Sequence, residues 1–190
     1  MEIRHLVPFP EKFYTRSPDI VASQLIGALL IFGPTVVRIV ETEAYFGPED
    51  PASRAAINGQ RGRFSLMWER PGLSLVYNVH RYWMFNVVAH EEGEVGAILI
   101  RAAEPIIPSV IDLRGPGKLT RALGIDASHH GKDLTIKGDL YLSPPQTKVE
   151  TVGCSYRIGV TKDLMKPYRF FDPNSNYVSA HKKAVYYIKT

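Results

Sequence analysis

The sequence contains a single cysteine, Cys154, among its 190 residues. One thiol excludes a disulfide within the chain and a cysteine-based zinc site. We therefore expect a reducing, intracellular compartment. Cys154 lies in the mixed segment TVGCSYRIGV, which is typical of an inert buried thiol.

Long apolar runs are also missing. No segment approaches the ~18 consecutive apolar residues that a membrane-spanning helix needs. The first residues, MEIRHLVPFPEKF, lack the apolar stretch of a signal peptide. These absences predict a protein without a membrane anchor and with a cytoplasmic location.

The composition is that of a folded domain. Hydrophobic residues make up 45% of the chain and aromatic residues 11%, which is enough to bury a core and argues against disorder. The length fits a single domain over residues 1–190, without internal repeat or linker. The net charge of +4 is compatible with a polyanionic partner and equally with an ordinary solvated surface.

The pattern of apolar residues predicts an α+β fold. Residues 17–30 have a helical pattern with Ser17 as N-cap and Pro18 in the first turn, and residues 115–126 predict a short helix that ends near Gly124. Short connections between the remaining runs favour antiparallel pairing. We expect a curved, mostly antiparallel β-sheet with surrounding helices. The predicted strands span residues 33–45, 73–79, 82–90, 96–105 (stopped by Pro105), 139–144 and 156–160.

Residues 46–72 form the longest irregular stretch, rich in Gly, Pro, Asp and Arg. A loop of this length inside a compact domain is usually functional.

The stretch IVETEAY, just before this loop, places two carboxylates in a run of β-branched residues. In a strand, Ile39, Glu41, Glu43 and Tyr45 share one face. A carboxylate in a partly apolar site is harder to ionise and is therefore more useful as a base. The pattern alone favours the other reading, in which both glutamates are edge-strand charges facing water.

Several blocks of the sequence resemble those of a known family. The blocks ETEAYFGPEDPAS, PGLSLVYNV, FNVV, LIRAAEP, GPGKLTRALGID, RIGVTKDLMKPYRFF and NYVS resemble, in order and spacing, the alkyladenine (3-methyladenine) DNA glycosylase family. They cover most of residues 13–179. The resemblance implies a monofunctional DNA glycosylase that flips a damaged purine out of duplex DNA and hydrolyses its N-glycosidic bond, initiating base excision repair. It also implies a monomer without metal, cofactor or AP-lyase activity. The implied substrates are alkylated adenine and also hypoxanthine or ethenoadenine. The implied location is near the nucleoid of a prokaryote.

The resemblance assigns the catalytic residues. Glu43 matches the general base that activates water, and Arg101 matches an arginine that helps to hold the water and the carboxylate. The main-chain carbonyl of Ile158 matches a third group around that water. Without the resemblance, Arg101 reads as a structural ion pair with Glu104 or Glu41.

The resemblance also assigns the base-binding pocket. Tyr45 and Tyr77 match aromatic residues that sandwich the flipped base, and Asn86 matches an asparagine at the pocket wall. Without the resemblance, both tyrosines would be interpreted as core residues and Asn86 as a hydrogen-bonding residue of the sheet. Arg54 departs from the family, which usually has a histidine there. A permanent positive charge repels a cationic purine, suits an acceptor on hypoxanthine, or reaches a phosphate.

Two further departures affect the contact with DNA. The turn in VYNVHRYWMFN is one residue shorter than in the family. By position, the residue that would fill the space left by the flipped base is His80, Arg81 or Tyr82. The alternative is an ordinary hairpin tip without this role. Phe64 stands where the family often has asparagine. Basic residues expected at the DNA backbone, or else merely exposed, are Arg61, Arg63, Arg70, Arg81, Lys118 and Arg121.

Two other functions fit parts of the pattern. Changes in the pocket at Arg54 and His80 fit a DNA-binding protein that senses lesions without cutting them. A metal-dependent hydrolase could use Glu41, Glu43, Asp50 and a histidine, but no histidine has ligand-like spacing near these acids.

Overall fold

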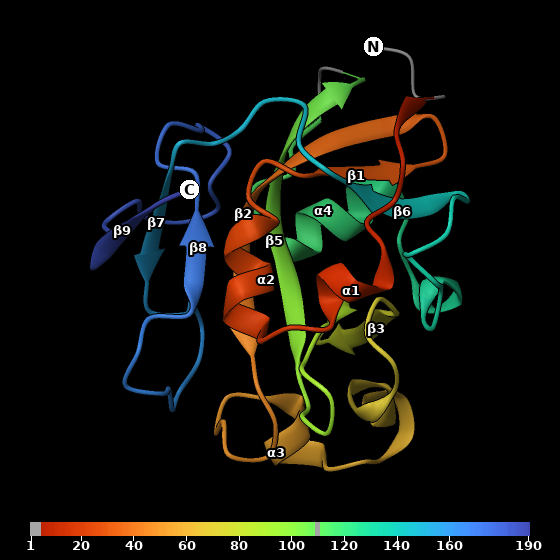
Figure 1. The fold of residues 1–190 in the computed structure, drawn as a ribbon, viewed down its shortest axis with the longest axis vertical. Helices are drawn as coiled ribbons and strands as arrows, with labels where there is room; N and C mark the ends of the chain where they lie inside the picture. The colour runs from red at the N-terminus through yellow and green to blue at the C-terminus, as the bar shows by residue number, and fades with distance from the viewer. Residues whose placement is uncertain (1–4, 109–110) are drawn as a thin grey trace.

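The computed structural model describes residues 5–108 and 111–190 of the chain. One nine-stranded sheet dominates it, and the paired strands are antiparallel throughout (Figure 1). Its main path runs β3-β4-β5-β2-β8-β7-β9, and β1 pairs with β2 and β6 beside this path. This confirms the predicted α+β class.

The strands are β1 (Leu29–Phe32), β2 (Thr35–Tyr45), β3 (Ser74–Val79), β4 (Tyr82–Val88), β5 (Ala97–Ile107), β6 (Leu140–Ser143), β7 (Thr151–Ser155), β8 (Arg169–Phe171) and β9 (Tyr186–Lys189). The helices are α1 (Glu11–Tyr14), α2 (Pro18–Gln24), α3 (Arg54–Asn58) and α4 (Pro116–Leu123), with the 3-10 helices η2 (Gly62–Trp68) and η3 (Ala127–His129). Within the described part of the chain, none of these helices has the length and apolar character that a membrane crossing requires.

The first predicted helix is shorter than the sequence indicates. It begins after Ser17 as expected but ends at Gln24, and the apolar residues that seemed to continue it form β1. The chain leaves the helix at Gly27, where φ is +91°, and the main chain of Gly27 and Ala28 already pairs with Ile39. Sheet pairing therefore overrides the helical pattern here.

Three other boundaries differ from the prediction. Pro105 does not stop β5, which continues to Ile107, because Pro105 lies opposite Val37 beside an irregularity in the ladder. Residues 156–160 form no strand, since β7 ends at Ser155 and a loop follows. The stretch 46–72 is less irregular than expected, because it contains α3 and η2, which pack on the edge of the sheet around Leu75 and Tyr77.

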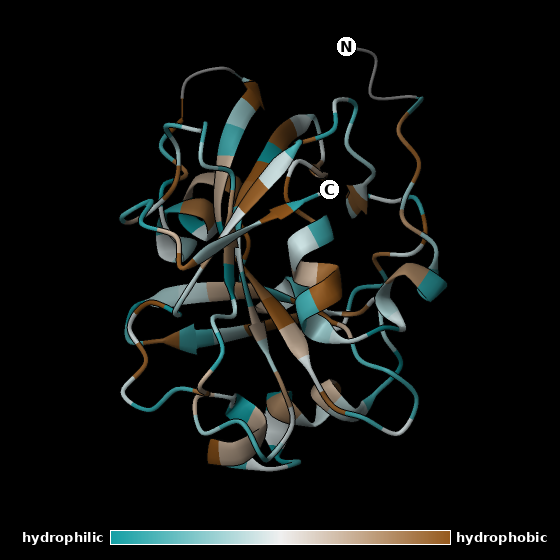
Figure 2. Cartoon of the chain, turned by 60° about the vertical axis from the view of Figure 1, so that its left-hand side comes forward, coloured by the Kyte–Doolittle hydropathy of each residue, from teal (hydrophilic) through white to brown (hydrophobic). Residues whose placement is uncertain are grey.

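The two faces of the central strands have different coverings. On one face, Ala44, Ile98 and Ile100 pack in the main core with residues of α2 and α4, and α2 lies against β2 and β5 (Figure 1). Figure 2 shows hydrophobic residues concentrated on these strands and on the helix packed against them. Ile39 also belongs to this core, so it does not share the face of the glutamates as predicted. The irregularity between Ile39 and Glu41 shifts the alternation by one residue.

The opposite face leads to the candidate site. At the lower end of β2 and β5 in Figure 1, α3 lies near the loop that descends between β7 and β8. Both segments line one cavity, with Arg54 and Ile57 from α3 and Ile158 and Lys162 from the loop. The sheet thus brings together segments that are about one hundred residues apart in the chain.

Candidate active site

Glu41 and Glu43 are buried charges in the middle of the sheet. Both side chains have 0% exposure, and β2 lies between β5 and β8. The reading as edge-strand charges facing water is therefore wrong. A buried carboxylate requires charged or hydrogen-bonding partners to stay ionised, and the structure supplies them.

Arg101 joins the two carboxylates. Its Nε donates to Glu41 Oε1 at 3.2 Å and its Nη1 to Glu43 Oε2 at 3.2 Å. In the β2–β5 ladder, Ala102 lies opposite Glu41 and Ile100 opposite Thr42, so Arg101 is the extra residue of a bulge. Bulges re-aim side chains, and this one places Arg101 over the face that carries both glutamates. The expected ion pair with Glu41 is present, and the alternative with Glu104 is not, because Glu104 pairs with Arg38.

Glu43 accepts three hydrogen bonds from the described residues. The main-chain N–H of Ile158 donates to Oε1 at 2.7 Å, and the Tyr45 hydroxyl donates to Oε2 at 2.7 Å, beside Arg101. The structure therefore brings together Glu43, Arg101, Ile158 and Tyr45, which the sequence places on three separate segments. These contacts fix the orientation of the carboxylate.

Glu41 binds Arg101 and is itself held by two further donors. Arg169 Nε donates to Glu41 Oε1 at 2.7 Å and the main-chain N–H of Ser179 donates to Oε2 at 2.6 Å. Burial raises the pKa of Glu41, but Arg169 and Arg101 more than offset this and hold that pKa below its ordinary value. The two carboxylates together raise the pKa of Arg101 against the opposing effect of burial.

Tyr45 is held between Glu43 and a second buried arginine. The Arg157 guanidinium lies 4.6 Å from the centre of the Tyr45 ring and donates to both carboxylate oxygens of Asp50, at 2.6 and 2.8 Å. Burial, followed by the charge of Glu43, raises the pKa of Tyr45 well above its ordinary value. The phenol is therefore protonated at neutral pH and acts as a donor to Glu43.

A cavity of about 540 Å³ is lined by Tyr45, Arg101 and Ile158, the three residues that donate to Glu43. Such a volume is typical of pockets that bind small molecules. Burial raises the pKa of the Tyr77 hydroxyl, against the opposing effect of the neighbouring Arg54 guanidinium. The cavity is lined by Tyr45, Pro51, Ala52, Arg54, Ile57, Tyr77, Val79, Met84, Leu99, Arg101, Pro116, Ile158, Gly159, Val160, Thr161 and Lys162.

Asn86 is not among the residues that line this cavity. Its side chain is buried, and its amide nitrogen donates to the main-chain carbonyls of Leu75 and Met84. Its contacts are those of a hydrogen-bonding residue of the sheet, adjacent to Tyr77.

The β3–β4 hairpin ends in a two-residue turn, His80 and Arg81, and both side chains are exposed. His80 has φ of 55°, a conformation that residues other than glycine rarely adopt. Tyr82 packs on α4, since a Cβ added to Gly117 would lie 2.7 Å from its ring and the Arg121 guanidinium lies 4.9 Å from the ring centre.

The predicted backbone-contacting cations have different surroundings. Arg61 is exposed, and the Arg63 guanidinium lies 5.9 Å from the Trp83 ring centre. Lys118 forms an ion pair with Asp112. Arg70 is held by Asp133 at 2.6 Å and by Glu11 at 3.4 Å.

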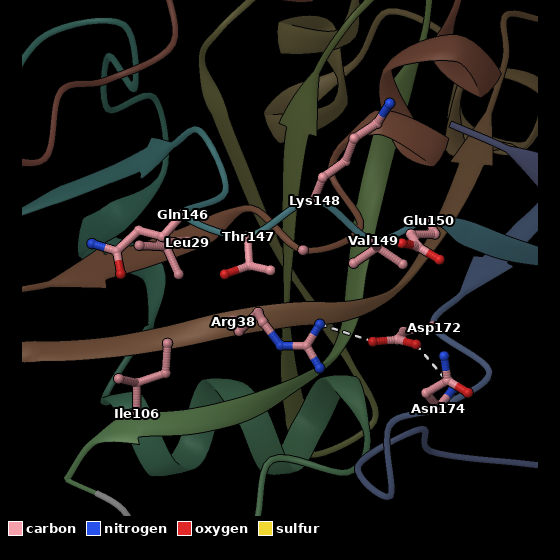
Figure 3. A pocket seen from close by; sticks show the side chains of 11 residues that line it. Leu29, Arg38, Ile106, Gln146, Thr147, Lys148, Val149, Glu150, Asp172 and Asn174 are labelled. Carbon is pink, nitrogen blue, oxygen red and sulfur yellow. Dashed lines mark hydrogen bonds and ion pairs between the residues drawn. The ribbon is translucent and has the colours of Figure 1, made fainter.

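A second cavity, of about 470 Å³, lies along another part of β2 (Figure 3). Figure 3 shows Arg38 directed at Asp172, with a distance of 2.8 Å in the ion pair. Glu104 binds the same guanidinium. This arginine is thus neutralised by two carboxylates, in contrast with Arg54 in the first cavity.

Across the described ranges, no three His, Cys, Asp or Glu side chains are grouped so that they could hold a metal ion. The combination of Glu41, Glu43, Asp50 and a histidine, which a metal-dependent hydrolase would need, is therefore not assembled. Asp50 instead pairs with Arg157.

Sequence reasoning missed three groups of the site: Arg157, Arg169 and the N–H of Ser179. The two arginines lie in apolar, β-type segments, YRIGV and YRFF. A charge in such a segment is rarely buried unless it is paired; Arg169 pairs with Glu41 and Arg157 with Asp50. No comparable signal marks Ser179.

Comparison with known proteins identifies relatives along most of the chain. The profile of the methylpurine-DNA glycosylase family matches residues 12–176. A protein of Aeropyrum pernix is 40% identical over 182 residues, covering 90% of this chain and 92% of its own. Relatives in Rickettsia conorii and Wolbachia pipientis are 36% and 39% identical, over 87% and 85% of this chain and 90% and 89% of their own. All three are provisionally named 3-methyladenine DNA glycosylases.

The family profile and these relatives define a class of enzyme, the DNA N-glycosylases, which are hydrolases of DNA repair. Within that class, the chain belongs to the methylpurine-DNA glycosylase family.

Proposed function

We propose that this enzyme excises damaged purines, alkylated adenine among them, from duplex DNA and that Glu43 activates the water that hydrolyses the N-glycosidic bond. The observation that carries the proposal is the buried Glu43 carboxylate, fixed by three donors beside a cavity lined by Tyr45 and Tyr77. The names of the relatives support adenine alkylated at N3 as one substrate. The enzyme works as a monomer on DNA in the cytoplasm, without metal or other cofactor.

The hydrogen bonds of Glu43 suggest where the water binds. A carboxylate accepts about four hydrogen bonds, and the described residues supply two to Oε2 and one to Oε1. The remaining acceptor position belongs to Oε1, which is the oxygen next to Ile158. A water there donates to Glu43 and also reaches the main-chain carbonyl of Ile158.

In the reaction the N-glycosidic bond breaks, a bond forms between C1′ and the water oxygen, and one proton passes from this water to Glu43. As the base leaves with the electron pair of the N-glycosidic bond, the sugar acquires oxocarbenium character. The water oxygen attacks C1′ while Glu43 Oε1 takes its proton, which leaves an abasic site. Arg101 and Tyr45 hold the Glu43 carboxylate in position for this proton transfer.

The damaged base reaches the cavity by leaving the helical stack. Tyr45 and Tyr77 offer their rings to the flipped base, and the hairpin tip fills the space that it vacates. Tyr82 is also exposed but packs on α4, whereas His80 and Arg81 form the tip of the turn, so we take these two as the wedge candidates. Arg61, Arg63, Lys118 and Arg121 contact the DNA backbone.

The test is incubation with duplexes that carry 3-methyladenine, 1,N6-ethenoadenine or hypoxanthine, with and without a chelator. We expect free base and alkali-labile sites in both conditions. Damage-dependent binding without release from any duplex would instead identify a lesion-sensing protein. Loss of activity in the chelator would show a metal-dependent reaction.

The wedge has a separate test. Glycine accepts the φ of 55° at position 80, so His80→Gly should keep the hairpin while removing the ring. Stacking on an aromatic side chain is worth about 1–3 kcal/mol, and we expect damaged-duplex binding to weaken by about 5- to 100-fold. Affinity for single-stranded damaged DNA, where no stack is opened, should not change. An equal loss on both substrates would contradict the wedge role.

A further inference from the structure

We infer that the base pocket selects uncharged purines with a keto oxygen, such as the deaminated purine hypoxanthine, over positively charged N-alkylpurines, and that Arg54 sets this selection. The inference rests on the proposed function, because it concerns the base that the same cavity receives.

The charges around the cavity carry the inference. Its lining includes Arg54, Arg101 and Lys162 and no aspartate or glutamate. Arg101 is neutralised by Glu41 and Glu43. By contrast, no carboxylate of the described ranges forms an ion pair with Arg54 or Lys162. The cavity therefore presents two positive charges that are not offset at its wall.

Arg54 is held in the cavity by aromatic rings. Its guanidinium lies 5.2 Å from the Tyr77 ring centre and 5.9 Å from the Phe64 ring centre, and these rings contact each other at 5.1 Å. Aromatic faces attract a guanidinium without cancelling its charge. The guanidinium is thus positioned beside Tyr77, the residue proposed to stack on the flipped base.

Arg38 shows how this fold neutralises an arginine at a cavity. There, Asp172 and Glu104 bind the guanidinium directly (Figure 3). Arg54 has aromatic neighbours and the Tyr77 hydroxyl in place of such carboxylates, and the N–H groups that do not face Tyr77 are open to a ligand. A base edge with two acceptors, such as O6 and N7 of hypoxanthine, matches the fork of donors on arginine.

The positive charge of Arg54 acts both when the base enters the cavity and when the base leaves the sugar. A purine alkylated at N3 or N7 is cationic in DNA, so bringing it next to Arg54 is electrostatically unfavourable in a site of low dielectric. An uncharged base instead acquires negative charge as it leaves with the electron pair of the glycosidic bond. Donors from Arg54 to its O6 and N7 stabilise that charge in the transition state. The same residue thus hinders one class of base and assists the other.

The test compares single-turnover release of hypoxanthine, 1,N6-ethenoadenine and 7-methylguanine from duplexes of one sequence, each rate divided by the spontaneous rate. We expect the largest enhancement for hypoxanthine. In Arg54→Gln, the ratio of hypoxanthine to 7-methylguanine enhancement should fall by about tenfold or more, because a unit charge near the base is removed. Ethenoadenine is uncharged and lacks the keto oxygen, so its rate should change least.

Two further variants define the cause. Lys12→Gln, which removes an exposed cation outside the cavity, should leave the ratio unchanged. Arg54→Lys keeps the positive charge but lacks the paired N–H donors of the guanidinium. Release of 7-methylguanine should therefore stay disfavoured, while release of hypoxanthine should slow. This variant carries the test if the glutamine variant does not fold.

Two results would overturn the inference. The first is an unchanged ratio of hypoxanthine to 7-methylguanine enhancement in Arg54→Gln. The second is an equal loss of rate on all three duplexes together with a weaker salt dependence of binding, which would show that Arg54 contacts a phosphate. Failure of the proposed function is distinguishable, since the unaltered enzyme would then release none of the three bases.

Discussion

Glu43→Gln should abolish base release while preserving binding to damaged duplex. The amide has nearly the same shape as the carboxylate, so the cavity and its tyrosines remain, but it cannot take a proton from water. General base catalysis contributes about 10²- to 10⁴-fold, and we expect a loss at the upper end of this range in single-turnover assays. Equilibrium binding to a damaged duplex should stay within about threefold of the unaltered enzyme, since Glu43 itself is fully buried.

The matched control is Glu49→Gln, which changes an exposed carboxylate on the loop after β2. Its rate should equal that of the unaltered enzyme. If Glu43→Gln also cuts at the unaltered rate, then Glu43 is not the base. If it loses binding and release together, then Glu43 acts on the structure of the pocket.

Glu41→Gln should cause the largest loss of stability. The change removes the negative charge between Arg101 and Arg169 and turns donors of the new amide toward other donors, at a fully buried position. Removing one partner of a buried ion pair costs about 3–5 kcal/mol, which is a large part of the stability of a typical domain. Urea unfolding should show a lower midpoint with an unchanged slope.

The control for stability is Glu11→Gln. Glu11 is exposed and forms only a 3.4 Å pair with Arg70, so its loss should cost at most about 1 kcal/mol. A loss at Glu41 no larger than this would show that the buried network contributes little to stability.

The acid dependence of stability provides an independent check on Glu41. Its pKa in the folded protein lies below the ordinary value of 4.5. Its contribution is therefore fully present above about pH 4.5 and is lost as the pH falls through the folded pKa. Glu41→Gln should flatten this part of the curve of unfolding free energy against pH.

The sequence by itself determined the parts that depend on local pattern. Alternation along IVETEAY placed Glu43 and Tyr45 on one face of a strand, and Gly124 marked the end of α4. Similarity over residues 12–176 established the family. These features follow from period, turn chemistry and block order, all of which are properties of neighbouring residues.

Only the tertiary structure decided which charges meet. Burial of Glu41 and Glu43 follows from the place of β2 between β5 and β8, and the reach of Arg101 depends on a bulge that no local pattern marks. Arg169 and the N–H of Ser179 reach Glu41 from more than one hundred residues away. Such contacts depend on how the whole sheet assembles, because free energies of burial and ion pairing are set by all the neighbours in space.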